Sequence, residues 1–197
     1  MHNQPRLLLH TCCATCGSWI PDELSMKYQV DLFYFNPNIH PEAEYYRRLG
    51  EIKKVSDILN LKVIEFPFDP QPWFQAVKGF EHEPEGGARC PICFEHRLRA
   101  TADYAKAHGY DAFATTLTSG RQKKAEIINP IGEKLSQEYG IEFLCRDFKK
   151  HGGSDHSMFC SDDYGVVRQN YCGCVFSKKA SLGQTLQNNS QSLPHVQ

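Results

Sequence analysis

Nine cysteines stand out among the 197 residues of this chain, and seven of them fall in three tight groups. The first group is HTCCATC at residues 10–16, the second is RCPIC at residues 89–93, and the third is YCGCVFS at residues 171–177. Thiolates are the ligands of structural zinc and of iron–sulfur clusters, and two neighbouring thiols can also exchange electrons as a disulfide. The spacing therefore indicates a soft-metal site, a redox pair or both.

The first group follows a short apolar segment, residues 6–10, that is typical of a buried strand. Nucleotide-binding α/β folds place a glycine-rich phosphate loop at this point, but here the glycines are replaced by Cys12, Cys13 and Cys16. A loop of thiols binds soft metal rather than phosphate. Small buried core residues are the alternative, which three cysteines within five residues disfavour. Cys16 is either a bystander or a ligand of a second metal.

Cys90 and Cys93 form a C-x-x-C pair at the predicted start of a helix, where the backbone amides favour the thiolate and lower the thiol pKa. Alone, the pair fits zinc, a thioredoxin-like redox pair or a cluster, but the layout does not match a thioredoxin fold. Together with Cys12 and Cys13 it could hold either a structural zinc or a four-iron cluster. A structural zinc usually lies at the periphery of a fold, so a position at the strand ends favours the cluster.

The third group contains Cys172 and Cys174, a C-x-C pair too tight to be the usual two ligands of one tetrahedral zinc. A disulfide between them would close a small ring, with Gly173 relaxing the backbone, and strained disulfides behave as labile, catalytic bonds. Two unrelated structural cysteines are the alternative. Cys145, expected in a strand, and Cys160, expected in a loop, have no thiol neighbour and are predicted to be bystanders.

The elements that must position these groups alternate between strand and helix. Apolar segments predict strands at residues 6–10, 30–39, 61–69, 110–118 and 141–148. Helices are predicted over residues 17–26, 41–60, from 70 onward with a polar loop at 81–89, over 90–109 and over 125–140. Alternation of this kind predicts an α/β fold with a parallel five-stranded sheet and helices on both faces. Residues 1–180 are expected to form one α/β catalytic domain, and the polar segment 181–197 a disordered tail.

Composition narrows the classes of protein. The formal net charge of -1 excludes a globally basic nucleic-acid binder but allows a local basic patch. No stretch approaches the roughly 20 apolar residues of a membrane helix, and the N-terminus lacks the pattern of a secretory signal. We therefore expect a cytoplasmic protein with no membrane partner. In that reducing compartment, clustered cysteines serve as metal ligands or redox catalysts more often than as structural disulfides.

Four motifs, taken together and in this order, resemble the QueH type of epoxyqueuosine reductase. They are LLLHTCCATC, RCPICFEHRLRATA, TTLTSGRQKKAEIINPIG and VVRQNYCGCVFS, and the resemblance runs from about residue 6 to residue 178. It implies an oxidoreductase that reduces the epoxide of epoxyqueuosine in tRNA to the alkene of queuosine, the last step of queuosine biosynthesis. It also implies a HUP-like fold, similar to adenine nucleotide alpha hydrolases, with the phosphate loop replaced by the Cys-rich loop.

The resemblance further implies the roles of six cysteines. Cys12, Cys13, Cys90 and Cys93 match the ligands of a [4Fe–4S] cluster, beside which the family is associated with an additional adjacent iron. Cys172 and Cys174 match a redox-active disulfide. The implied partners are a tRNA with a queuosine-type anticodon loop and an external electron donor. The chain departs from the family pattern at CCATC, where CCAPC is common, and at SGRQK, which is looser than Ser-Pro-x-Lys; neither change removes a thiol.

Other residues near the motifs have two interpretations each. His10 either contacts the cluster or caps the strand end, and Arg97, one helical turn beyond Cys93, either offsets the charge of the cluster or is a surface residue. Acidic and phenolic side chains near the C-x-C pair are candidate proton donors, with a solvated loop as the alternative for the two aspartates: Asp162, Asp163, Tyr164 and Tyr171. Basic residues that flank the motifs are expected to contact RNA phosphates: Lys123, Lys124, Lys149, Lys150, Arg168, Lys178 and Lys179.

Two other classes of protein fit part of the pattern. A tRNA-thiolating enzyme of the same superfamily would need a Gly/Ser-rich pyrophosphate loop after the first strand, where HTCCATC stands instead. A zinc-stabilised binding module without catalysis would hold stoichiometric zinc and be colourless.

Overall fold

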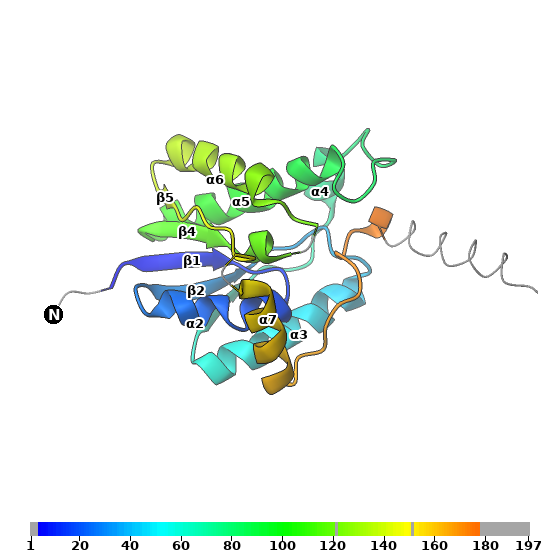
Figure 1. Cartoon of the computed structure of the whole chain (residues 1–197). Helices are drawn as coiled ribbons and strands as arrows, with labels where there is room; N and C mark the ends of the chain where they lie inside the picture. Colours follow the sequence, from blue (N-terminus) through cyan, green and yellow to red (C-terminus); the bar gives the residue numbers. More distant parts are fainter. Residues whose placement is uncertain (1–3, 121, 151, 178–197) are drawn as a thin grey trace, which may run out of the picture.

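A parallel five-stranded sheet forms the centre of the computed structural model, which describes residues 4–120, 122–150 and 152–177 (Figure 1). The strands lie in the order β3-β2-β1-β4-β5, and each neighbouring pair is parallel. Their bounds are β1 Arg6–His10, β2 Gln29–Tyr34, β3 Lys62–Glu65, β4 Ala112–Thr115 and β5 Glu142–Phe143. The predicted α/β fold class is confirmed.

Helices cover both faces of the sheet (Figure 1). On one face lie α1 Ala14–Gly17, α2 Ile20–Ser25, α3 Glu42–Leu59 and α7 Gly153–Asp163. On the other lie α5 Arg89–Ala107 and α6 Ala125–Tyr139, and the short helix α4 Gln71–Ala76 packs against α5. Successive side chains of a strand point to opposite faces, so the wholly apolar centre of β1 serves two cores. Leu7 and Leu9 belong to the α3 side, and Leu8 packs with α5 and α6.

The strand order reverses beside β1, which places a crevice at the C-terminal edge of the sheet. From β1 the chain continues to β2 on one side, whereas β4 lies on the other side and leads towards β5. Loops that leave neighbouring strands in opposite directions open a crevice in which ligands of such folds bind. The loop after β1 carries Cys12 and Cys13, and β4 continues directly into a 3₁₀ turn at Thr116–Ser119.

Three local predictions from the sequence are wrong. The helix expected over 17–26 is divided into α1 and α2, and Trp19 occupies the N-cap position of the second. The loop expected around Cys160 is helix α7, which was missed because its Gly, Ser and Asp residues show little helical periodicity. Strand β5 ends at Phe143, so Cys145 lies outside the strand and is exposed.

The tail expected at residues 181–197 lies outside the described residues. Within the described ranges, no helix is long and apolar enough to cross a membrane.

The close packing of α6 on β5 predicts how a substitution at this contact changes stability. A Cβ atom added to Gly132, inside α6, would lie 2.3 Å from the nearest ring atom of Phe143. We therefore expect Gly132→Ala to lower the free energy of unfolding by about 1–3 kcal/mol, although alanine is the better helix former. Gly50 in α3 is the matched control: nothing lies within 4 Å of its Cβ position, so Gly50→Ala should raise that free energy by about 0.5–1 kcal/mol. Urea unfolding of both variants measures the difference, and equal effects at the two positions would contradict this packing.

Candidate thiol redox and metal site

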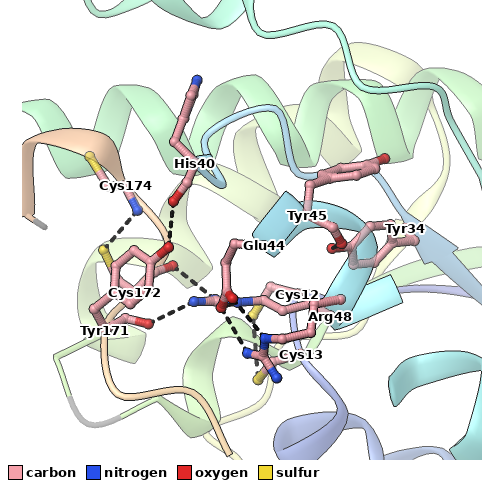
Figure 2. Close-up of polar contacts among 11 residues, drawn as sticks. Cys12, Cys13, Tyr34, His40, Glu44, Tyr45, Arg48, Tyr171, Cys172 and Cys174 are labelled. Carbon is pink, nitrogen blue, oxygen red and sulfur yellow. Dashed lines mark hydrogen bonds and ion pairs between the residues drawn. The ribbon is translucent and has the colours of Figure 1, made fainter. Parts of the chain in front are cut away.

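The first cysteine group lies at the crevice, immediately after β1. Cys12 and Cys13 are 3% and 1% exposed, and their Sγ atoms are 4.0 Å apart (Figure 2). Cys16 follows in α1 and is buried in the same apolar cluster, against which Cys90 from the first turn of α5 also packs. The first and second groups thus border the same apolar cluster.

The second and third groups meet in a hollow. Cys93 is buried in a cluster with Cys174, and Cys172 packs against that cluster. The thiols of all three, with Cys90, line one hollow at the end of α5. Cys90 and Cys93 therefore share one hollow with the C-x-C pair.

A buried arginine of α3 holds the C-x-C segment in place. Arg48 is 3% exposed, and its guanidinium donates hydrogen bonds to the carbonyl oxygens of Tyr171 (3.0 Å) and Cys172 (3.3 Å) while it lies over the Tyr171 ring (Figure 2). The backbone N–H of His40 donates to the carbonyl of Gly173 at 2.8 Å, and the Tyr171 hydroxyl donates to the carbonyl of His40. The segment is thus fixed to α3 and to the turn after β2.

Gly173 is required by this docking. Its φ of 101° lies in the region that side chains disfavour, and a Cβ atom there would lie 2.8 Å from Cγ1 of Ile39. The resulting turn lets the backbone N–H of Cys174 donate to Sγ of Cys172 at 3.4 Å. Both cysteines are free thiols, which is the reduced state of the predicted pair.

Two cations face the thiols. The ammonium Nζ of Lys123 lies 3.7 Å from Sγ of Cys12, and the Lys123 side chain lines the hollow with Arg97. Arg97 is 2% exposed and donates to the Cys93 carbonyl and to Oδ1 of Asn36, so its interpretation as a surface residue is wrong. In the described part of the chain, neither cation forms a salt bridge with a carboxylate. The charge of Lys123 is directed at the sulfur of Cys12, and the charge of Arg97 lies in the same hollow.

The pKa values of the thiols in the first loop are shifted in opposite directions. Hydrogen bonds from Cys13 and Cys16, together with the charges of Lys123 and Arg97, hold the pKa of Cys12 well below its usual range. The hydrogen bond between Cys12 and Cys13, which lowers the pKa of Cys12, raises the pKa of Cys13 to about 11. Burial raises the pKa of Cys90, so the lowering expected from the helix N-terminus is wrong for this residue.

The chemistry of these side chains fits an anionic thiolate-bound group. Cys12, Cys13, Cys90 and Cys93 offer four soft donors from two segments, and buried cations without carboxylate partners require a compensating negative charge nearby. Thiolates around a metal or a cluster provide that charge. In the described ranges, however, no three Cys, His, Asp or Glu side chains are close enough to hold a single metal ion in the arrangement seen.

The remaining predicted residues lie elsewhere. Both ring nitrogens of His10 are engaged, Nδ1 with Oγ1 of Thr115 (3.0 Å) and Nε2 with the carbonyl of Phe35 (3.3 Å), so His10 joins strands rather than facing the thiols. Burial, followed by the charge of Arg97, lowers its pKa to about 3. The described lining of the hollow contains none of the four proposed proton donors: Asp162, Asp163, Tyr164 and Tyr171.

The basic residues divide into three sets. Lys123 lies within the thiol site rather than on the open surface, and Nζ of Lys149 donates to its carbonyl at 2.8 Å. Lys124 and Lys150 are exposed, and Arg168 pairs with Asp162. The two lysines predicted at positions 178 and 179 lie outside the described residues. The sequence patterns also missed Arg48, and they missed the turn after β2 because residues 36–39 fall within the strand predicted at 30–39, whereas β2 ends at Tyr34.

A doubly wound α/β sheet with thiols in place of the phosphate loop defines an α/β protein with a cysteine-rich site at the C-terminal edge of its sheet. The sequence matches the family model of epoxyqueuosine reductase QueH over residues 7–180. The chain therefore belongs to the epoxyqueuosine reductase QueH family and is an oxidoreductase of queuosine biosynthesis.

Individual relatives agree. The chain is 39% identical over 182 residues to the epoxyqueuosine reductase QueH of Staphylococcus epidermidis, covering 88% of this chain and 76% of the relative. It is 36% identical over 177 residues to that of Thermotoga maritima, covering 87% and 89%. Among solved structures, a predicted subunit of tRNA methyltransferase from Methanocaldococcus jannaschii has a TM-score of 0.53 at 14% identity, covering 77% of this chain and 74% of that one. This last likeness supports the fold alone.

The contact between the two thiols of the C-x-C pair predicts how their oxidation depends on pH. A hydrogen bond from Cys172 lowers the pKa of Cys174 to about 6, whereas the pKa of Cys172 is raised by the same bond. In the reduced protein we expect the rate of diamide oxidation of the pair to rise as the pH passes about 6 and to be level at neutral pH. In Cys172→Ala, which removes the donor, the titration of Cys174, followed by thiolate absorbance, should move towards that of an ordinary cysteine, near 8.5. An unchanged midpoint would contradict the assigned hydrogen bond.

Proposed function

We propose that this chain reduces the epoxide of epoxyqueuosine in tRNA to the alkene of queuosine, the last step of queuosine biosynthesis. Family membership supports the reaction. The observation that carries the assignment of residues is that Cys172 and Cys174 line the same hollow as Cys90 and Cys93. A small substrate group that enters this hollow would lie beside both the C-x-C pair and two of the thiols that we assign to a cluster.

Cys172 and Cys174 supply the electrons. Removing the oxygen of an epoxide as water breaks two C–O bonds, forms one carbon–carbon π bond, and consumes two electrons and two protons. Oxidation of the pair to a disulfide releases two electrons. With Cys174 as thiolate and Cys172 as thiol, one proton comes from Cys172 and the other from solvent. An external electron donor then returns the disulfide to two thiols.

Cys12, Cys13, Cys90 and Cys93 would hold a [4Fe–4S] cluster. When bound, such a cluster supplies one-electron chemistry, and an additional iron beside it would supply a Lewis acid for the epoxide oxygen. The support for this assignment is the convergence of the two loops and the two uncompensated cations, Lys123 and Arg97. Cys16 is the thiol of the first loop that is left for an additional adjacent iron.

The substrate partner is a tRNA with a queuosine-type anticodon loop, which places the reaction in the cytoplasm. A second hollow of about 530 Å³ lies between α2 and the segment that follows β5. It presents the exposed cations Arg146 and Lys150 beside the rings of Trp19 and His156. The same lining includes the carboxylates of Asp22, Glu23 and Asp147, which outnumber these two cations and disfavour RNA phosphates at this surface.

The function is tested by the fate of the epoxide. With excess tRNA and reductant, we expect Cys172→Ala, Cys174→Ala and the double variant to lose multiple turnover at least about a hundredfold, because the two-electron store is gone. Cys145→Ala is the matched control, since Cys145 is exposed and does not line the hollow; it should keep full activity. Mass spectrometry of nucleosides from digested tRNA measures the conversion. Full multiple turnover by the double variant would exclude this role.

The cluster assignment is tested by metal content. We expect the anaerobically purified protein to be brown and to contain iron and acid-labile sulfide. Alanine at Cys12, Cys13, Cys90 or Cys93 should lower both strongly, whereas Cys160→Ala in α7 and Cys145→Ala should not. A colourless protein with stoichiometric zinc would instead support the binding module without catalysis.

A further inference from the structure

Two buried polar atoms beside the redox thiols lack a partner. Asn38 and Trp73 line the hollow together with Cys93 and Cys174, and they are 3% and 0% exposed. Within the described residues, Oδ1 of Asn38 and Nε1 of Trp73 form no hydrogen bond. Buried donors and acceptors in native proteins are nearly always paired, so an unpaired donor and an unpaired acceptor in one hollow point to a ligand.

Both side chains are held in place by the segments that form the redox site. The carbonyl of Asn38 accepts from Nδ1 of His40 at 2.9 Å, and the next residue, Ile39, forms a β-bridge with Cys174. The Trp73 ring packs against the rings of His40 and Phe176 at centroid distances of 5.7 and 6.0 Å. The unpaired atoms therefore have a fixed relation to the C-x-C pair.

The chemistry of the missing partner follows from the two atoms. The amide oxygen of Asn38 accepts a hydrogen bond and the indole N–H of Trp73 donates one. A hydroxyl group satisfies both, because its oxygen accepts while its hydrogen is donated. The enclosed part of the hollow measures about 30 Å³, which is room for a group the size of a hydroxyl or a water molecule.

We propose that Asn38 and Trp73 bind a hydroxyl group of the substrate's cyclopentane ring and thereby orient its epoxide towards Cys172 and Cys174. This inference rests on the proposed function. The ring that carries the epoxide in epoxyqueuosine also carries two hydroxyls, so a contact with one of them fixes the position of the reacting carbons. Such a contact also gives specificity, because a substrate without the hydroxyl would leave both protein atoms unpaired.

The test removes each of the two unpaired atoms in turn. Trp73→Phe keeps an aromatic ring and removes the N–H, and Asn38→Ala removes the acceptor. We expect each to lower kcat/KM for tRNA containing epoxyqueuosine by about tenfold, the loss of one hydrogen bond in a buried site. Iron content and the rate of diamide oxidation of Cys172 and Cys174 should stay as in the parent protein, whereas the melting temperature should fall because each change removes buried volume. Asn129→Ala is the control: Oδ1 of Asn129 is also buried without a partner in the described residues, but it does not line the hollow.

A double variant tests whether one hydroxyl contacts both residues. If it does, the fold-loss of kcat/KM in the double variant Trp73→Phe with Asn38→Ala should be clearly smaller than the product of the two single fold-losses. The reason is that the first change already displaces the hydroxyl that the second residue would bind. Single variants with the kcat/KM of the parent, or strictly multiplicative losses, would overturn the inference. If Asn38→Ala does not fold, Trp73→Phe alone decides. A parent protein that leaves the epoxide intact would instead refute the proposed function.

Discussion

The position of the C-x-C pair depends on a buried ion pair within one turn of α3. Nε of Arg48 lies 2.7 Å from a carboxylate oxygen of Glu44, which leaves the other two guanidinium nitrogens to bind the carbonyls of Tyr171 and Cys172. Hydrogen bonds from Arg47 and then Arg48 lower the pKa of Glu44 to about 2. The stabilisation from this shift is therefore complete above the carboxylate's ordinary pKa of 4.5 and is lost only as the pH falls towards 2. At physiological pH the C-terminal segment has a charged, fully bonded anchor.

The parallel sheet explains why segments so far apart in sequence can form one site. Each strand delivers its following loop to the same edge, so the thiols after β1, the turn after β2 and the residues after β4 converge there. Helix α5 begins at the same edge and contributes Cys90 and Cys93. Lys123 and Arg97 lie at this edge and form no salt bridge in the described ranges, while the exposed carboxylate of Glu85 also lines the hollow. An anionic group bound by thiolates is what such an edge accommodates best.

Sequence patterns predicted the sheet because apolar segments mark strands, and they singled out the three cysteine groups because tight thiol spacing is rare by chance. They could not predict α7, because its side chains lack helical periodicity. They also could not distinguish Lys123 from Lys124, since both residues are lysines and only the folded structure shows that the Lys123 side chain lies in the thiol site while that of Lys124 is exposed. In sequence, Arg48 looks like one of the exposed charged residues on the outer face of a helix. Only the tertiary structure shows that it is buried against a segment 123 residues away. Asn38 and Trp73 were missed for the same reason, since an unpaired buried atom has no signature in sequence.

Anchoring and chemistry are linked through Gly173. Its left-handed backbone lets Cys174 approach Sγ of Cys172 with its N–H, and its missing side chain lets the segment lie against Ile39. The turn that contains Ile39 also carries Asn38. The β-bridge between Ile39 and Cys174 therefore connects the residue that would bind the substrate to the thiols that would reduce it. A shift of the C-x-C segment relative to this turn would change the distance between the bound hydroxyl and the electron store. Arg48 and Gly173, although neither touches the substrate, should therefore influence the rate of reduction through position alone.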